Sequence, residues 1–304
     1  MIRFLGVRLV QAMLTLLGSS VLIFGLAYTS GSPADVILPA EATPAERVEF
    51  IKRMGLDRPI SYQYWVFLTN VLRGDWGTSI RTGKPATELV KERIGNSMKL
   101  ATAAMGVTLA IGLPLGVLAA VHRGGTWDKF GMAFALLGQS LPAFWLGIVM
   151  ILIFAVALRW LPTSGMDSWR HYILPAVVIG WGVSAGVVRL LRSSMLEVLD
   201  SEFVKTARAK GQRERLVVWR HALRNALIPV ITFVGFMYGV IIAAAVVVEV
   251  VFGWPGLGRL AYESTLWRDY PVLQLTVLVW TGLVIVINLM VDISYGLLDP
   301  RIRT

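Results

Sequence analysis

Six stretches of this chain are apolar over a length that can cross a lipid bilayer. A spanning helix needs about 20 mostly apolar residues to cover roughly 30 Å of hydrocarbon. With 56% hydrophobic and 16% charged residues, the composition is too apolar for a soluble domain. We therefore expect an all-α membrane protein with six transmembrane helices. The stretches are Phe4–Tyr28, Leu100–Val121, Phe130–Leu158, Tyr172–Leu191, Pro229–Val251 and Val272–Leu298.

The distribution of positive charge predicts the topology. The net charge of +10 would suit a nucleic-acid partner, but its placement fits a membrane protein better. Short loops on one side of the expected membrane carry fourteen Lys and Arg, and those on the other side carry four. Because such residues gather in cytoplasmic loops, both termini are expected inside. The outer segment 30–98 holds nine more, but loops beyond about 60 residues cross largely regardless of charge.

These spans predict three parts. Residues 1–29 form an N-terminal transmembrane helix, 30–98 an extracytoplasmic cap domain, and 99–304 a five-helix transmembrane core with a cytoplasmic loop at 200–225. In the cap, Thr43 and Glu46 have the spacing of a capping box, which predicts a helix start. We expect a folded cap, and an inert spacer is the alternative.

Catalytic and metal-binding patterns are missing from the sequence. The chain has no cysteine, and its three histidines fall in loops or at helix ends without ligand spacing. The glycine-rich run Gly77–Pro85 has one residue too many between its glycines for a phosphate-binding loop, and Pro85 stands where Ser or Thr is needed. We expect no catalytic residues, no metal and no bound cofactor.

Polar residues inside spans have two interpretations. Glu249 lies near the outer end of the fifth stretch, and Asn288 lies one turn before Asp292 in the last. Burying such groups in a bilayer is costly, so they are often functional. Their positions near helix ends favour anchoring or interhelical bonding, and a lining role in a translocation pathway is the alternative for Glu249 and Asn288.

A strongly basic loop, Asp200–Asn225, separates the fourth and fifth stretches. Its pattern predicts two short amphipathic helices hinged at Gly211, with Phe203, Val204 and Ala207 on one face of the first. Glycine suits the sharp turn because it adopts left-handed backbone angles freely. Such a loop fits a docking element for a partner, and a patch lying on anionic lipid is the alternative.

The loop resembles the coupling loop of ABC importer permeases, in particular the oligopeptide/dipeptide family. The resemblance rests on Phe203–Gly211 and Arg220–Pro229, and further blocks agree in order along the chain. The loop sequence departs from the general importer pattern at Lys205-Thr206 and Leu223-Arg224, as is usual in the peptide branch. The further blocks are Gly74–Ser79, Ser140–Gly147, Leu161–Gly165, Phe252–Gly258 with Arg268–Pro271, and Leu298–Arg303.

The resemblance implies a type I ABC importer permease fold and a loop seated in a groove of a cytoplasmic ATPase. The coupling residues would be Phe203, Val204, Thr206, Ala207, Arg208, Ala209, Lys210, Gly211, Arg220, His221, Arg224 and Asn225. Arg213 replaces the Ser that commonly caps the second short helix, which weakens that helix start.

The resemblance also implies the partners. They are a second homologous permease, two nucleotide-binding ATPase subunits that bind ATP and Mg, an extracytoplasmic solute-binding protein and the lipid of a prokaryotic inner membrane. Peptides are the expected cargo, and nickel, glutathione-like or sugar and opine solutes are alternatives within the family. An ion-coupled secondary transporter, a different class, would need paired midmembrane carboxylates or broken inverted repeats. A channel would need a selectivity filter.

Overall fold

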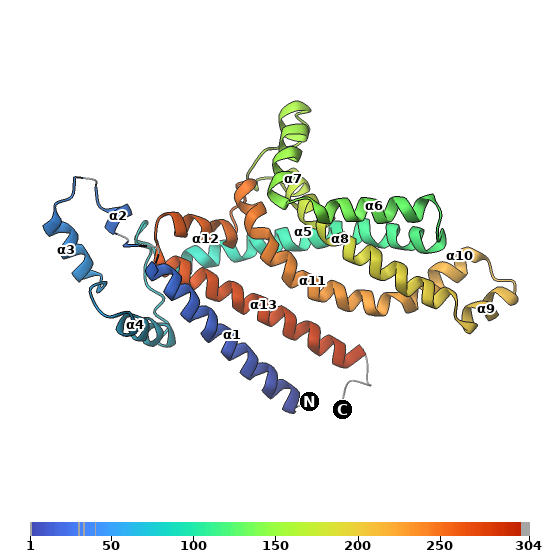
Figure 1. Cartoon of the computed structure of the whole chain (residues 1–304), viewed down its shortest axis with the longest axis horizontal. Helices are drawn as coiled ribbons and strands as arrows, with labels where there is room; N and C mark the ends of the chain where they lie inside the picture. Colours follow the sequence, from blue (N-terminus) through green and yellow to red (C-terminus); the bar gives the residue numbers. More distant parts are fainter. Residues whose placement is uncertain (1, 30, 33, 40, 299–304) are drawn as a thin grey trace. The chain divides into compact units, whose positions relative to one another are not determined.

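The computed structural model describes residues 2–29, 31–32, 34–39 and 41–298 (Figure 1). These residues are helical almost throughout, and the β structure among them is one isolated bridge between Thr78 and Pro85. The chain divides into two compact units, which are described separately. The first holds the residues up to 96 together with 255–286, and the second holds 97–254 and the residues from 287 on. The three-part division expected from the sequence stays a prediction.

Five of the described helices are long and apolar enough to span a membrane, and a bent pair makes up to six. The expected third span is this pair: α6 (Thr126–Ser140) is followed by α7 (Ala143–Met150) and the π-helical η1 (Ile151–Ala157), at an angle of 102°. Proline disfavours the helical conformation of the residue before it, and Leu141 before Pro142 is extended, with φ −86° and ψ 130°. The break therefore follows from Pro142.

The first unit holds α1 (Ile2–Thr29), three short helices, the first turns of α5 (Ala86–Val121), α12 (Leu257–Leu266) and the first half of α13 (Tyr270–Leu298). The short helices are α2 (Ala34–Ile37), α3 (Pro44–Arg53) and α4 (Ile60–Leu72). The N-terminus of α5 packs on α12 and α13 through a core of Ala86, Val90, Leu257, Leu260, Val272 and Leu275.

The capping box predicted for α3 is confirmed. The Thr43 N–H donates to a Glu46 carboxylate oxygen at 2.7 Å, and the Glu46 N–H donates to Thr43 Oγ1 at 3.3 Å. The Thr43 N–H and the Thr43 hydroxyl, which donates to the same carboxylate oxygen at 2.9 Å, lower the pKa of Glu46. The start of α3 is thus fixed by two local hydrogen bonds.

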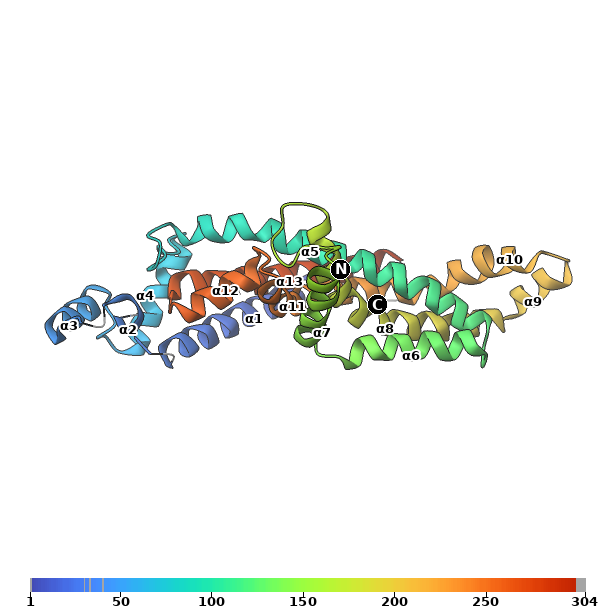
Figure 2. The ribbon, with the colours of Figure 1, turned by 90° about the horizontal axis from the view of Figure 1, so that it is seen from above.

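The second unit is built around α8 (Arg170–Leu199), which packs against α6 and against α11 (Leu223–Val251) (Figure 2). The helix α5 approaches α8 closely because two glycines of α5 face it. A Cβ added at Gly112 would lie 2.7 Å from Val187, and one at Gly116 would lie 3.0 Å from Leu191. Small residues allow this backbone approach between membrane helices. The shared core is rich in Val, Ala and Leu.

Candidate functional site

The basic loop, Asp200–Asn225, starts with the helix α9 (Glu202–Ala209), labelled in Figure 1. After a turn come α10 (Glu214–Leu216) and the π-helical η2 (Val217–Ala222), which runs directly into α11. The prediction of a separate second short helix is therefore wrong. No Gly or Pro stands between residues 213 and 228, so nothing ends the helix before the span begins.

Gly211 ends α9 as predicted. Its φ of +73° lies in the left-handed region. The Gly211 N–H donates to the Arg208 carbonyl at 2.9 Å, and the Gln212 N–H donates to the Ala207 carbonyl at 3.3 Å. These two bonds form a Schellman motif, in which glycine is favoured at the left-handed position.

The apolar face of α9 is turned into the chain itself. Val204 is fully buried and Ala207 is nearly so, and both pack with Val217 against the end of α8. The prediction that Val204 and Ala207 enter a partner's groove is therefore wrong, because intramolecular packing already covers them. Phe203, in contrast, is 48% exposed. Of the three residues predicted on this face, Phe203 alone is available for contact with a partner.

Two apolar residues that sequence analysis did not single out are exposed on the same loop. Leu216 is 41% exposed and Trp219 is 56% exposed. Their spacing of three places them on one helical face. An apolar pair within the polar, basic loop is the pattern that would have revealed them. Basic and small residues of the same loop are exposed as well, including Ala209, Lys210, Arg220 and Arg224.

Polar contacts within the loop hold its turn. Arg208 makes a two-point ion pair with Glu214 across the Gly211 turn, with nitrogen–oxygen distances of 3.1 and 2.7 Å. The hydrogen bond to this carboxylate raises the pKa of Arg208. The Thr206 hydroxyl donates to the Glu202 carbonyl, and the Asn225 amide donates to the His221 carbonyl.

The predicted pathway residues lie in different surroundings. Glu249 on α11 is fully buried, and the Ser97 hydroxyl of α5 donates to its carboxylate at 2.6 Å. This bond joins the two helices. Asn288 on α13 is half-buried. That Glu249 and Asn288 line a pathway stays a prediction.

In the first unit, the run Gly77–Pro85 forms a tight hairpin turn that holds a carboxylate. The Ser79 hydroxyl donates to Asp269 at 2.5 Å and the Ile80 N–H donates to Asp269 at 3.1 Å. We call Ser79, Ile80 and Asp269 the Asp269 clasp. Ser79 and Asp269 are buried. The glycine-rich run thus binds a side chain of its own protein.

Matches to two models of one protein family identify the family of the chain. Residues 112–304 match the family described as "Binding-protein-dependent transport system inner membrane component", and residues 1–95 match its N-terminal counterpart. The chain belongs to this family. The match includes the predicted C-terminal block Leu298–Arg303. Of this block, only Leu298 belongs to the residues that the structure describes.

Curated relatives of the permease cover its whole length. The chain is 44% identical over 298 residues to "Glutathione transport system permease protein GsiC" of Pectobacterium atrosepticum, with 97% of each chain covered. It is 42% identical to the GsiC protein of Salmonella typhimurium over 304 residues, covering 100% of this chain and 99% of the relative. The GsiC protein of Escherichia coli strain K12 is 40% identical over 305 residues, with the same coverage.

Solved structures show the same fold. A chain of the inward-facing MetNI methionine ABC transporter matches with a TM-score of 0.61 at 19% identity, covering 71% of this permease and 98% of that chain. An amino acid ABC transporter matches with a TM-score of 0.54 at 15% identity, covering 68% and 93%. The resemblance predicted from the sequence is confirmed.

The family fixes the general role of the permease. It is a multi-pass inner-membrane protein and the permease subunit of an ABC importer. The family has no cofactor of its own, and ATP hydrolysis resides in partner subunits of the transporter. Among the residues that the structure describes, no group of three or more His, Asp or Glu is placed to hold a metal ion.

Proposed function

We propose that this permease forms half of the pathway of an ATP-driven importer for glutathione or a closely similar small peptide. The observation that carries the proposal is the 40–44% identity to proteins named as glutathione transport permeases, over 97–100% of this chain. This similarity supports the glutathione-like cargo, which the sequence analysis gave as an alternative, better than the peptides that it expected.

The proposed assembly has four further subunits in the membrane or beside it. A second homologous permease completes the pathway, and two ATPase subunits dock on the cytoplasmic side, one of them on the basic loop of this chain. An extracytoplasmic solute-binding protein delivers cargo to the cap at 30–98, and both termini lie in the cytoplasm. ATP binding would shift the permease between outward-open and inward-open states through contacts that differ between them.

The exposed surface of the basic loop supports the docking site for the ATPase. Phe203, Leu216 and Trp219 offer apolar contact area, and the basic side chains around them would attract an acidic rim. Aromatic residues dominate the energy of many protein interfaces. Three other predicted coupling residues contribute by shaping the loop rather than by direct contact: Val204 and Ala207 seat it on α8, and Gly211 turns it.

Uptake measurements test the cargo. The permease, expressed with its partner genes in a host lacking its own glutathione importer, should accumulate labelled glutathione. An excess of unlabelled glutathione should compete more strongly than an unrelated dipeptide, a nickel salt or a sugar. Preferential competition by any of those three would transfer the assignment to that solute.

The energy source tests the class of transporter. Depleting ATP should stop uptake, and a protonophore applied at constant ATP should leave the initial rate unchanged. The opposite pattern would identify an ion-coupled secondary transporter and refute the importer assembly.

A further inference from the structure

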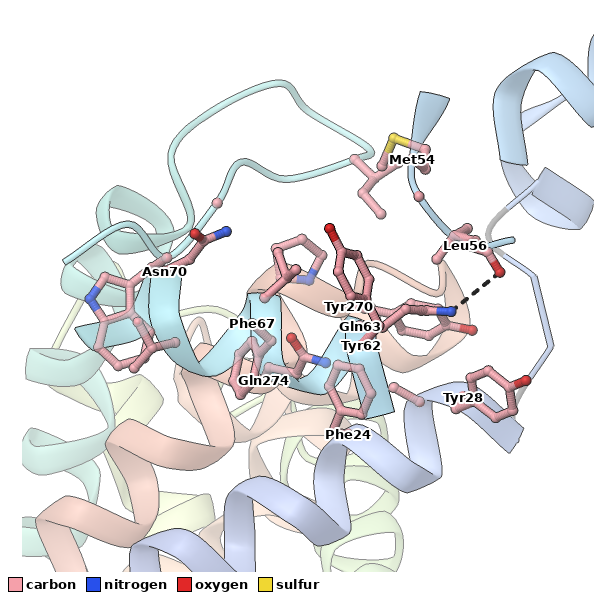
Figure 3. Close-up of a pocket in the computed structure, with 18 of the residues that line it drawn as sticks. Phe24, Tyr28, Met54, Leu56, Tyr62, Gln63, Phe67, Asn70, Tyr270 and Gln274 are labelled. Atoms are coloured by element: carbon pink, nitrogen blue, oxygen red, sulfur yellow. Dashed lines mark hydrogen bonds between the residues drawn. The ribbon is translucent and has the colours of Figure 1, made fainter. Parts of the chain in front are cut away.

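The first unit contains a pocket at the end of two candidate spans. Its volume is about 680 Å³, within the range of small-molecule sites. The last turns of α1 contribute Phe24 and Tyr28, the helix α4 contributes Phe67, and the start of α13 contributes Tyr270 and Gln274 (Figure 3). The candidate spans of α1 and α13 end at Thr29 and begin at Tyr270.

Direct bonds hold these two span ends together. The Tyr270 hydroxyl donates to the Gly31 carbonyl, two residues after α1. Arg268, just before α13, donates to the Ser32 carbonyl and to Asp35, both at 2.8 Å. Because both candidate spans end here, we place the pocket at the depth of the membrane interface. Tyr and Trp gather at this depth in membrane proteins.

The lining has the chemistry of an uncharged, amphipathic guest. Aromatic rings form much of the wall, with the side-chain amides of Gln63, Asn70 and Gln274 between them (Figure 3). Among the described lining residues, Asp75 carries the one charged side chain, and its carboxylate accepts the Gly77 N–H at 3.0 Å. The lining that the structure describes holds no cation and therefore suits an uncharged part of a guest.

Gln274 offers the pocket a hydrogen-bond donor. The residue is 7% exposed, and among the described residues its side chain has no hydrogen-bond partner. It lies close to Phe24 and Phe67 in the pocket (Figure 3). Because this amide lines the pocket without a partner in the described part of the chain, a guest with an acceptor such as an ester carbonyl would find a donor there.

We propose that this pocket holds one membrane phospholipid by its glycerol-ester region and the upper part of an acyl chain. The ester carbonyls would accept from the amides of Gln274 and Asn70, and the chain would pack against the aromatic wall. Arg58, whose guanidinium lies 5.8 Å from the ring centre of the lining residue Tyr62, supplies positive charge beside the pocket for the phosphate. The site binds lipid and is separate from the cargo.

Photolabelling of the full chain tests the site. The permease is reconstituted into vesicles of phosphatidylcholine that carries a diazirine near the acyl ester, then irradiated, and the labelled peptides are mapped. Label should concentrate on α4 around Phe67 and on Gln274. Val66→Trp, which fills the pocket, should reduce this label about tenfold. Leu72→Trp, on the same helix but 78% exposed and outside the lining, is the matched control and should keep it.

Two results would overturn the proposal. One is labelling of the pocket no stronger than labelling of the exposed α1 residues Leu22 and Leu26, which would mean surrounding lipid only. The other is a photo-reactive amino acid at position 274 that crosslinks to the solute-binding protein in the assembled transporter and not to lipid. Gln274→Leu provides a second check, since it removes the amide with little change in volume and should weaken the label without unfolding the pocket.

Discussion

The basic loop and the Asp269 clasp both hold a polar segment against helices, but by opposite means. In the loop, Val204 and Val217 are buried at the base and the charges lie outside. In the clasp, the carboxylate itself is buried and receives two hydrogen bonds. Apolar packing has no direction, whereas hydrogen bonds demand a defined geometry. We infer that the loop can rock on its base, while the clasp fixes its turn in one orientation.

The largest effect is expected from Val204→Asp. It places a carboxylate in an apolar base and should destabilise the folded loop by more than about 3 kcal/mol. Trypsin should then cleave the loop rapidly in inverted membrane vesicles, and uptake should be lost. Val204→Ala removes packing without charge and should cost about 2 kcal/mol, with the loop still folded. Equal trypsin resistance of Val204→Asp and the wild type would refute the apolar base.

Removing the acceptor of the clasp should have the next largest effect. Asp269→Ala leaves the buried Ser79 hydroxyl and the partly buried Ile80 N–H without their acceptor, at up to about 1–3 kcal/mol each. Because the chain has no cysteine, Thr82→Cys can report on the turn by its labelling rate. Labelling should accelerate in Asp269→Ala and much less in Asp269→Asn, which keeps one acceptor oxygen. Identical rates for the two variants would show that the carboxylate does not orient the turn.

Gly211→Val tests whether the loop needs its turn. A β-branched residue at φ +73° is strained by about 1–3 kcal/mol, although no atom lies within 4 Å of the added Cβ. The variant should insert normally but couple ATP hydrolysis poorly to uptake. Gly211→Asn tolerates the left-handed conformation and serves as control. Normal uptake by Gly211→Val would remove the coupling role from the loop.

The smallest effect is expected at the Arg208–Glu214 pair. Both side chains are well exposed, at 42% and 57%, so Arg208→Gln should cost no more than about 1 kcal/mol. Trypsin cleavage at the loop arginines should rise slightly at low salt, and the difference from the wild type should fade at high salt because ions screen the pair. Glu214→Gln should behave alike. A large loss of trypsin resistance that does not depend on salt would mean that the pair stabilises the loop far more than an exposed ion pair does.

Sequence analysis succeeded where structure follows from neighbouring residues. Five spans, the capping box of Thr43 and Glu46, and the Gly211 turn all depend on local patterns. The family followed from several such motifs in order.

Contacts between segments that lie far apart in the sequence could not be predicted. The amphipathic face at Val204 was predicted correctly, but periodicity does not say whether α8 or a partner covers it. Ser79 and Asp269 lie 190 residues apart, and no spacing rule joins them. The pocket at Gln274 combines three distant segments for the same reason.

One uninterrupted helix, Glu214–Val251, links the basic loop directly to the far end of a membrane span. Its 38 residues reach about 55 Å at the rise of an α-helix, well beyond the roughly 30 Å of hydrocarbon. If the loop end is held by an ATPase, a tilt of about 10° there would displace the other end, where Glu249 lies, by about 10 Å. A small movement imposed at the loop end would thus reach the surroundings of Glu249 through one continuous helix.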